Sequence, residues 1–544
     1  MQTSNVILCE TTKLSGEWVG SILKDDQEEF IRISFTEQWC DLPQRKQFNL
    51  SIFVTEADNA FTVSDSFYFA IERNDRAQGL NGNVNQISNF CLWPVAKADT
   101  APNQTVGGSY QLNNGREFFI AAEAGIHWPV WQLYYHEGDN LVRLYPIGEE
   151  NYLSELCELF TFSGNKLSVR SAHGEQNTGL RITLYTEESL EIAVETGYKL
   201  AGSLLTPLQP GPHPLVILIH GAGPGLRGDY LMVADIFARQ GIAVFVYDKR
   251  GWGKSTGEPM WSDIFKLADD AEAVIRQVRQ HPKVDAKRMG LWGFSNGGWV
   301  APLAASRCHD IAFIISFSGS GVPPARQEQI RRCTVAKEVL GASADQVALL
   351  ERFWGEVFRF GATGEWTTAL ENVIDTVEND LGLQALPKHE GYPEQLQPVP
   401  PRRTRAEWLE FGGQDAQMAL DPVPIFRELP SPILFVWGEQ DSVVPAEESR
   451  RAIVNGLQNR DNYAILMAPN AGHGSPFCPG LRGRLAPQAS SCPLISRWGF
   501  RSNGCWDYYR AQPPKHWCVI VLSIWGSHCP LCLFPNAALH RCVS

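Results

Sequence analysis

The strongest constraint on the fold is a series of continuous apolar segments that alternates with helical segments from about residue 190 onward. Pro214–Ile219 and Ile242–Tyr247 are apolar at nearly every position, as expected of strands that are buried on both faces of a parallel sheet. The residues between them, 229–240, have a helical pattern that ends at Gly241. This alternation predicts a doubly wound, mostly parallel α/β sheet.

The alternation continues and is interrupted once. Further helices are expected over 261–280, 296–306 and 446–457, and further strands over 288–294, 311–317, 432–437 and 463–467. Between these strands, residues 321–430 are mostly helical and are expected to form an inserted cap above the strand ends. Such an insertion costs little stability, because loop-closure entropy grows only logarithmically with length. The predicted α/β domain therefore spans residues 186–474.

The two ends of the chain differ from this central part. Residues 1–185 alternate apolar and polar positions in short runs, as in Phe48–Val54, and are expected to form a β-rich accessory domain. Residues 475–544 contain one acidic residue, Asp507, against seven Lys or Arg, together with seven Cys and four Trp. Because no helical or strand period persists there, we expect this tail to be atypical and not to pack as part of the fold.

Composition and charge exclude several classes of protein. Hydrophobic residues make up 44% of the chain and the net charge is −13, so the chain should fold but should not bind nucleic acid. The N-terminus lacks a secretory signal pattern, and no run of about 18 apolar residues could span a bilayer. We therefore expect a cytoplasmic protein with a small-molecule substrate and no membrane partner. The oligomeric state stays open.

The thirteen cysteines do not indicate a metal site. Six are scattered over the first 333 residues and are expected to be buried or free thiols. In the tail, Cys529-Pro-Leu-Cys532 is a lone C-x-x-C pair without the second pair of a zinc ribbon. We expect no bound metal.

The sequence Gly293-Phe-Ser295-Asn-Gly297 carries the clearest chemical signal. It matches G-x-S-x-G and lies directly after an expected strand and before an expected helix, where a nucleophilic serine occupies a sharp, strained turn. The glycines are required because side chains at those two positions would collide with neighbouring backbone. We predict that Ser295 is a nucleophile.

A serine hydroxyl needs an oriented base beside it before it can attack a carbonyl carbon at neutral pH. His473 follows the last expected strand, and Asp441 lies four residues after the strand that ends at Trp437. The order serine, aspartate, histidine is the one that accompanies this type of turn. We predict that His473 is the general base and that Asp441 orients it, with Glu439 as the alternative acid.

Acyl transfer also requires two N–H donors that face the developing oxyanion. One expected donor is the backbone N–H of Asn296. The other is the backbone N–H of Ala222 or Gly223, in the segment His220–Gly225 that follows the first long strand.

Two nucleotide-binding patterns overlap these segments. Gly223-x-Gly225-x-x-Gly228 matches the dinucleotide fingerprint, and Asp248 ends the next strand, where a ribose-binding acid belongs. Against this interpretation, Pro224 has no N–H to offer a pyrophosphate. Gly253-Lys-Ser255 resembles the end of a Walker A loop, but the first glycine position holds Asp248. We therefore expect no cofactor.

Further motifs within residues 196–329 include Tyr247-Asp-Lys-Arg-Gly-Trp-Gly and Gly319-Ser-Gly-Val-Pro. Together with the serine and His220 segments they resemble the bacterial EstD-type carboxylesterases of the α/β-hydrolase superfamily, which are related to dienelactone hydrolases and prolyl oligopeptidases. Gly16-Glu-Trp-Val-Gly20 is similar to the opening of the β domain in those esterases. The chain departs from the family after the histidine loop, where the family has a final helix.

The resemblance implies an α/β-hydrolase fold and cofactor-free hydrolysis of short-chain esters, with the serine, aspartate and histidine on Ser295, Asp441 and His473. The Asp248 segment is expected to be a loop tied by an ion pair. Thioesterase and serine peptidase activities stay open because the same three residues serve both reactions. A further alternative is a non-catalytic hydrolase-like protein that its altered C-terminus has inactivated.

Overall fold

The computed structural model describes the seven strands within residues 16–94 and then residues 106–473, except 125–130, 138–139, 149, 172–173, 196, 309, 389–396, 414 and 469–470. The predicted tail, residues 475–544 with its C-x-x-C pair, lies outside the described residues. Each helix within the described ranges is too short or too polar to cross a bilayer.

The centre of the molecule is an eight-stranded sheet in the order β16-β17-β19-β18-β20-β21-β22-β23. The six strands from β18 to β23 pair in parallel, whereas β17 pairs antiparallel with both β16 and β19. The strands are β16 Tyr185–Ala193, β17 Lys199–Pro207, β18 His213–Ile219, β19 Ala243–Tyr247, β20 Val284–Phe294, β21 Phe313–Phe317, β22 Ile433–Gly438 and β23 Tyr463–Ala468. The mostly parallel α/β sheet expected from the apolar runs is therefore present.

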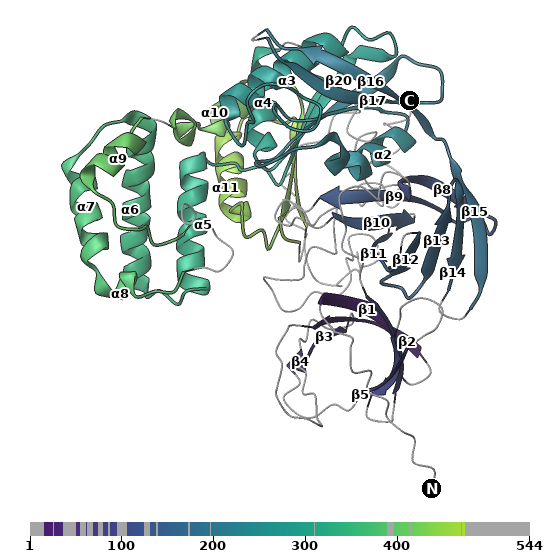
Figure 1. Cartoon of the computed structure of the whole chain (residues 1–544). Helices are drawn as coiled ribbons and strands as arrows, with labels where there is room; N and C mark the ends of the chain where they lie inside the picture. The colour runs from purple at the N-terminus through teal and green to yellow at the C-terminus, as the bar shows by residue number, and fades with distance from the viewer. Residues whose placement is uncertain are drawn as a thin grey trace, which may run out of the picture.

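Both faces of this sheet are buried, which explains the continuous apolar runs. In β18, Leu215, Ile217 and Ile219 belong to one core cluster, and the alternating Val216 and Leu218 belong to the other. Helix α2 (Leu231–Arg239) covers the second cluster. The first cluster packs against α3 (Ile264–Val278), α4 (Gly297–Arg307), α10 (Pro422–Glu428) and α11 (Ala446–Gly456) (Figure 1).

The strand order reverses at β18, which lies between β19 and β20. In such a sheet, the loops that follow the two central strands diverge at the carboxyl edge and leave room for a ligand. Here those loops carry the His220–Gly225 segment after β18 and Ser295 after β20. The fold thus brings together two segments that the sequence analysis singled out.

A separate helical unit is inserted between β21 and β22 and lies at the left of Figure 1. It has its own apolar core, which includes Phe353, Leu370 and Trp408. Its elements are α5 Pro324–Glu338, α6 Ala344–Thr363, α7 Thr368–Asn379, α8 Leu381–Gln384, α9 Arg405–Phe411 and the 3₁₀ helix η3 Ala416–Ala419. The following helix α10 differs, because its Phe426 packs into the central core.

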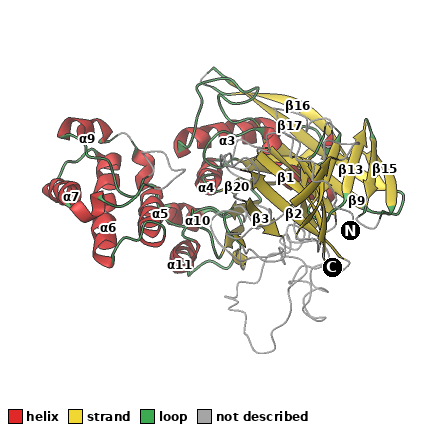
Figure 2. Cartoon of the chain, turned by 60° about the horizontal axis from the view of Figure 1, so that its bottom comes forward, coloured by secondary structure: helices red, strands yellow, loops and turns green. Residues whose placement is uncertain are grey.

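The N-terminal region, expected to be one β-rich domain, contains two separate sheets. The first is seven-stranded: β1 Gly16–Lys24, β2 Gln27–Phe35, β3 Leu50–Val54, β4 Phe61–Thr62, β5 Phe69–Arg73, β6 Leu80–Val84 and β7 Ser88–Pro94. The second is a closed barrel: β8 Gly108–Leu112, β9 Glu117–Ala124, β10 Trp131–Glu137, β11 Asn140–Pro146, β12 Asn151–Ser154, β13 Leu159–Ser163, β14 Lys166–Arg170 and β15 Gln176–Ile182. Figure 2 shows strands in yellow and the helical unit of α5 to α9 in red, on the opposite side of the view from β13 and β15.

The barrel contacts the α/β layers at helix α2. Phe119 and Ala121 of β9 pack against Met232 of α2 in a small apolar cluster. Beside it, Ser109 of β8 accepts a hydrogen bond from Arg239 at 2.9 Å and donates one to Asp235 at 3.4 Å. Asp235 and Arg239 form an ion pair at 2.5 Å, so polar and apolar contacts together join the barrel to α2.

Candidate active site

Ser295 occupies the sharp turn between β20 and α4 that the motif predicts. Its φ of 52° lies in the left-handed region, which an L-residue adopts only under strain. A Cβ on Gly293 would lie 2.1 Å from the Gly297 carbonyl oxygen, and one on Gly297 would lie 2.6 Å from that of Ile219. Only glycine fits at both positions, and the turn holds Ser295 at the carboxyl edge of the sheet.

The structure brings Ser295, His473 and Asp441 into one line of contacts. His473 Nε2 lies 3.0 Å from Ser295 Oγ, and His473 Nδ1 lies 2.8 Å from Asp441 Oδ2. The histidine side chain is 10% exposed and the carboxylate is fully buried. A neutral histidine with its proton on Nδ1 would donate to Asp441 and accept from the serine hydroxyl.

The loop after β22 positions the Asp441 carboxylate and also contacts the loop that carries His473. Asp441 Oδ1 accepts hydrogen bonds from the backbone N–H groups of Val443 and Val444, each at 2.8 Å. The backbone N–H of Gln440 donates to the Ala471 carbonyl at 2.9 Å, two residues before His473. Glu439, the alternative acid, is exposed to solvent. Among the two candidates, Asp441 is the one that contacts the imidazole.

The backbone amides expected to bind an oxyanion differ in their partners. The Gly223 N–H donates to the Trp261 carbonyl at 2.9 Å, so it is already used within the protein. The N–H groups of Ala222 and Asn296 donate no hydrogen bond within the described part of the chain. Of the two amides expected in the loop, only that of Ala222 is left for a ligand.

Lys249 is a residue of this site that the sequence analysis did not single out. Its side chain is buried, and its Nζ donates to the carbonyls of Gly221, Gly223 and Trp261 at 2.8, 3.0 and 2.6 Å. The available signal was its place directly after β19, at the edge of the sheet where ligands bind. The run Asp248-Lys-Arg250 was instead expected to be a loop tied by an ion pair, which gave Lys249 no role of its own.

His220 and Asp248 have structural roles beside the loop. Burial lowers the pKa of His220 to about 4, so the ring is neutral at pH 7, and its Nε2 contacts the Tyr247 carbonyl at 2.5 Å. Asp248 pairs with Arg227 at 2.8 Å and accepts a hydrogen bond from the Lys254 amide. Because its carboxylate is engaged in this way, Asp248 fits the expected ion-paired loop better than a ribose-binding acid.

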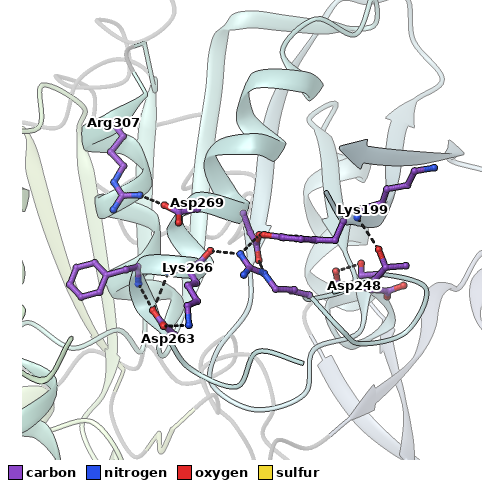
Figure 3. A network of polar contacts seen from close by, with 12 residues as sticks. Lys199, Asp248, Asp263, Lys266, Asp269 and Arg307 are labelled. Carbon is purple, nitrogen blue, oxygen red and sulfur yellow. Dashed lines mark hydrogen bonds and ion pairs between the residues drawn. The ribbon is translucent and has the colours of Figure 1, made fainter. Parts of the chain in front are cut away.

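The segment before α3 is fixed by a wider polar network. Asp263 caps α3 by accepting from the backbone N–H groups of Phe265 and Lys266, each at 3.1 Å. Arg307 of α4 pairs with Asp269 of α3 at 2.5 Å, as Figure 3 shows. The Asn296 side chain donates to the Ser262 carbonyl at 3.3 Å. Asn296, which follows Ser295, is thus tied to the start of α3.

Comparison with known proteins identifies the central part of the chain. Residues 210–475 match the family described as serine aminopeptidase, S33. The thiohydrolase aneE of Aspergillus aculeatus is 29% identical over 176 residues, which cover 30% of this chain and 55% of the relative. The quorum-quenching protein AidA of Acinetobacter baumannii is 31% identical over 119 residues, which cover 22% and 39%. The chain thus spans about half, or less, of the length of these curated relatives.

Among solved structures, an esterase of Pyrococcus furiosus aligns with 53% of this chain and 84% of its own, at 16% identity and a TM-score of 0.35. Est1E of Butyrivibrio proteoclasticus, solved with ferulic acid bound, aligns with 53% of this chain and 92% of its own, at 20% identity and a TM-score of 0.33.

Proposed function

Because residues 210–475 belong to the serine aminopeptidase S33 family of α/β hydrolases, we propose that this chain hydrolyses carboxylic esters through an acyl-serine intermediate. The observation that carries the proposal is the line of contacts from Asp441 through His473 to Ser295, at 2.8 and 3.0 Å. In this role Ser295 is the nucleophile, His473 the general base and Asp441 the acid that orients the histidine.

The reaction would proceed in two similar halves. Ser295 Oγ bonds to the ester carbonyl carbon while His473 Nε2 takes the hydroxyl proton, and the imidazolium is stabilised by the buried Asp441 carboxylate. The backbone N–H groups of Asn296 and Ala222 would bind the oxyanion, and each such donor contributes roughly a hundredfold to a thousandfold in rate. His473 then gives the proton to the leaving alcohol, and water repeats the sequence on the acyl-serine.

Short-chain esters are the proposed first substrates, as the resemblance to EstD-type carboxylesterases implies. Thioester hydrolysis is a second candidate because a matching relative is a thiohydrolase and the same three residues serve both reactions. Matched oxygen and sulfur esters of one acyl group separate these candidates: a kcat/KM at least tenfold higher for the thioester would favour the second.

The test compares the parent chain with Ser295→Ala on p-nitrophenyl acetate. We expect the variant to lose roughly three or more orders of magnitude in kcat, as removal of the nucleophile does in serine hydrolases. Ser306→Ala is the matched control, because Ser306 lies exposed on the neighbouring helix α4, and it should keep parental activity.

Covalent labelling by a fluorophosphonate provides an independent readout, since it requires an activated serine. A parent chain that neither labels nor hydrolyses any ester would contradict the proposal and favour a non-catalytic hydrolase-like protein.

A further inference from the structure

Lys249 forms an unusually complete set of contacts for a buried lysine. It lies directly after β19 and is 1% exposed. An ammonium group has three protons to donate, and here three backbone carbonyls accept them: Gly221, Gly223 and Trp261. Within the described residues, no carboxylate lies within ion-pair distance of Lys249. The backbone of two loops therefore satisfies this cation.

Two of the three accepting carbonyls, those of Gly221 and Gly223, lie on either side of Ala222. The Gly221 carbonyl and the Ala222 N–H belong to one planar trans peptide group, so the two bonds point in opposite directions. When Lys249 holds the Gly221 carbonyl, it also fixes the direction of the Ala222 N–H. A rotation of this peptide would break the 2.8 Å hydrogen bond to Nζ.

The other two contacts of Lys249 hold the loop on the Gly223 side of Ala222. The Trp261 carbonyl accepts from both Lys249 Nζ and the Gly223 N–H, at 2.6 and 2.9 Å, and the Gly223 carbonyl accepts from Nζ at 3.0 Å. Lys249, Gly223 and Trp261 thus form a closed set of hydrogen bonds. The Gly221 side of the loop lies next to Ser295, because a Cβ on Gly221 would lie 3.3 Å from the Ser295 Cβ.

We propose that Lys249 is a positioning residue that holds the Ala222 peptide with its N–H directed at the oxyanion formed on Ser295. This inference rests on the proposed function, since it assigns the second donor of the same acyl-transfer site. It also explains why a lysine is buried here, where an unpaired charge would otherwise be costly.

Only the ammonium form completes these contacts. A neutral amine has two protons and a lone pair, so one of the three carbonyls would lose its donor. Burial lowers the pKa of Lys249 to about 7, an effect that the Asp270 carboxylate opposes. The other titratable groups nearby are the buried His220 and the ion-paired Asp248. Lysine is charged below its pKa, so the support for the Ala222 peptide should weaken as pH rises through about 7.

The experiment uses the full chain with Lys249→Met, Lys249→Arg and the control Lys254→Met. Methionine keeps the length of the side chain without its donors. Lys254 lies exposed in the same loop after β19 and undergoes the same change. On p-nitrophenyl acetate at pH 6.5, we expect Lys249→Met to lower kcat by about 10-fold to 100-fold, with KM within about twofold. This loss is smaller than the roughly hundredfold to thousandfold for removal of an oxyanion donor, because the Ala222 N–H would be displaced and not removed. Lys254→Met should keep kcat within about threefold.

The pH profile gives a second readout that a purely structural role would not change. Guanidinium stays charged throughout the accessible pH range, so the ratio of kcat for Lys249→Arg to kcat for the parent should be below one at pH 6.5 and should rise between pH 6.5 and 8.5. Superimposable normalised profiles for the parent and Lys249→Arg would overturn the proposal. If Lys249→Met does not fold, the pH profiles of the parent and Lys249→Arg still test the role of Lys249.

Failure of this inference is distinguishable from failure of the proposed function. If the parent hydrolyses the ester and Ser295→Ala does not, but a folded Lys249→Met keeps its kcat, only the role of Lys249 is refuted. If the parent has no activity and does not label with a fluorophosphonate, the proposed function fails, and the role of Lys249 fails with it.

Discussion

The two oxygens of Asp441 have separate partners, which allows its role to be tested at the scale of one atom. Oδ1 accepts two backbone N–H groups of its own loop, and Oδ2 faces His473. Asp441→Asn can keep the first set of contacts, but its amide no longer stabilises an imidazolium and favours the wrong tautomer of the histidine. We expect kcat for p-nitrophenyl acetate to fall by about 10⁴-fold while the protein stays folded.

Glu439→Gln is the matched control, because Glu439 lies two residues earlier in the same loop and is exposed. It makes the same change from acid to amide and should leave kcat within about twofold of the parent. Equal losses in the two variants would show that the charge of the loop matters, and not the contact between Asp441 and His473.

Some residues of the candidate site could be singled out from sequence because their signal is local. Ser295 was marked by two glycines and by its place between a strand and a helix, and Asp441 and His473 by their order after later strands. The choice between the Ala222 and Gly223 amides was not predictable. It depends on the Trp261 carbonyl, about forty residues away, which accepts the Gly223 N–H. Lys249 was missed for the same reason, since its acceptors are distant backbone atoms.

At the scale of elements, the turn between β20 and α4 depends on close approach to β18. A Cβ on Gly297 would lie 2.6 Å from the Ile219 carbonyl oxygen and 2.9 Å from that of His220, and backbone atoms in a central sheet cannot easily move away. Alanine is otherwise favoured over glycine in a helix by about 1 kcal/mol. Despite this, we expect Gly297→Ala to lower the free energy of unfolding by about 3 kcal/mol, as measured by urea denaturation.

Gly228→Ala provides the comparison, because a Cβ on Gly228 would meet no atom within 4 Å. We expect this variant to change the free energy of unfolding by less than about 1 kcal/mol. If Gly297→Ala is as stable as Gly228→Ala, the close approach of α4 to β18 does not hold in solution.

The six parallel strands of the central sheet, β18 to β23, were predicted closely, whereas β16, β17 and the arrangement of the N-terminal strands were not. Strands such as β18 and β19 are buried on both faces, so their sequence is almost entirely apolar and easy to locate. In the N-terminal region, the alternation of apolar and polar residues predicts strands but does not specify their partners. Closure of β8 to β15 into a barrel, apart from the sheet of β1 to β7, depends on pairings such as β8 with β15.

At the scale of the whole molecule, a buried ion pair in α2 connects the barrel to the α/β layers. Asp235 and Arg239 lie 2.5 Å apart, with side-chain exposures of 1% and 20%, and Ser109 of the barrel hydrogen-bonds to both. Removal of the carboxylate would leave the guanidinium without its counter-ion in a largely buried site, which costs about 3 to 5 kcal/mol. We expect Asp235→Ala to lower the free energy of unfolding by this amount.

Asp269→Ala is a matched control, because Asp269 and Arg307 form a pair at the same distance of 2.5 Å but with exposures of 58% and 33% (Figure 3). Since exposed pairs contribute about 0 to 1 kcal/mol, this variant should unfold almost as the parent does in urea. Limited proteolysis adds a readout of the contact itself: with Asp235→Ala, cleavage between the barrel and β16 should become faster at urea concentrations that leave the α/β layers folded. Equal stability and equal cleavage in the two variants would mean that the apolar contact of Phe119 with Met232 joins the two parts without help from the ion pair.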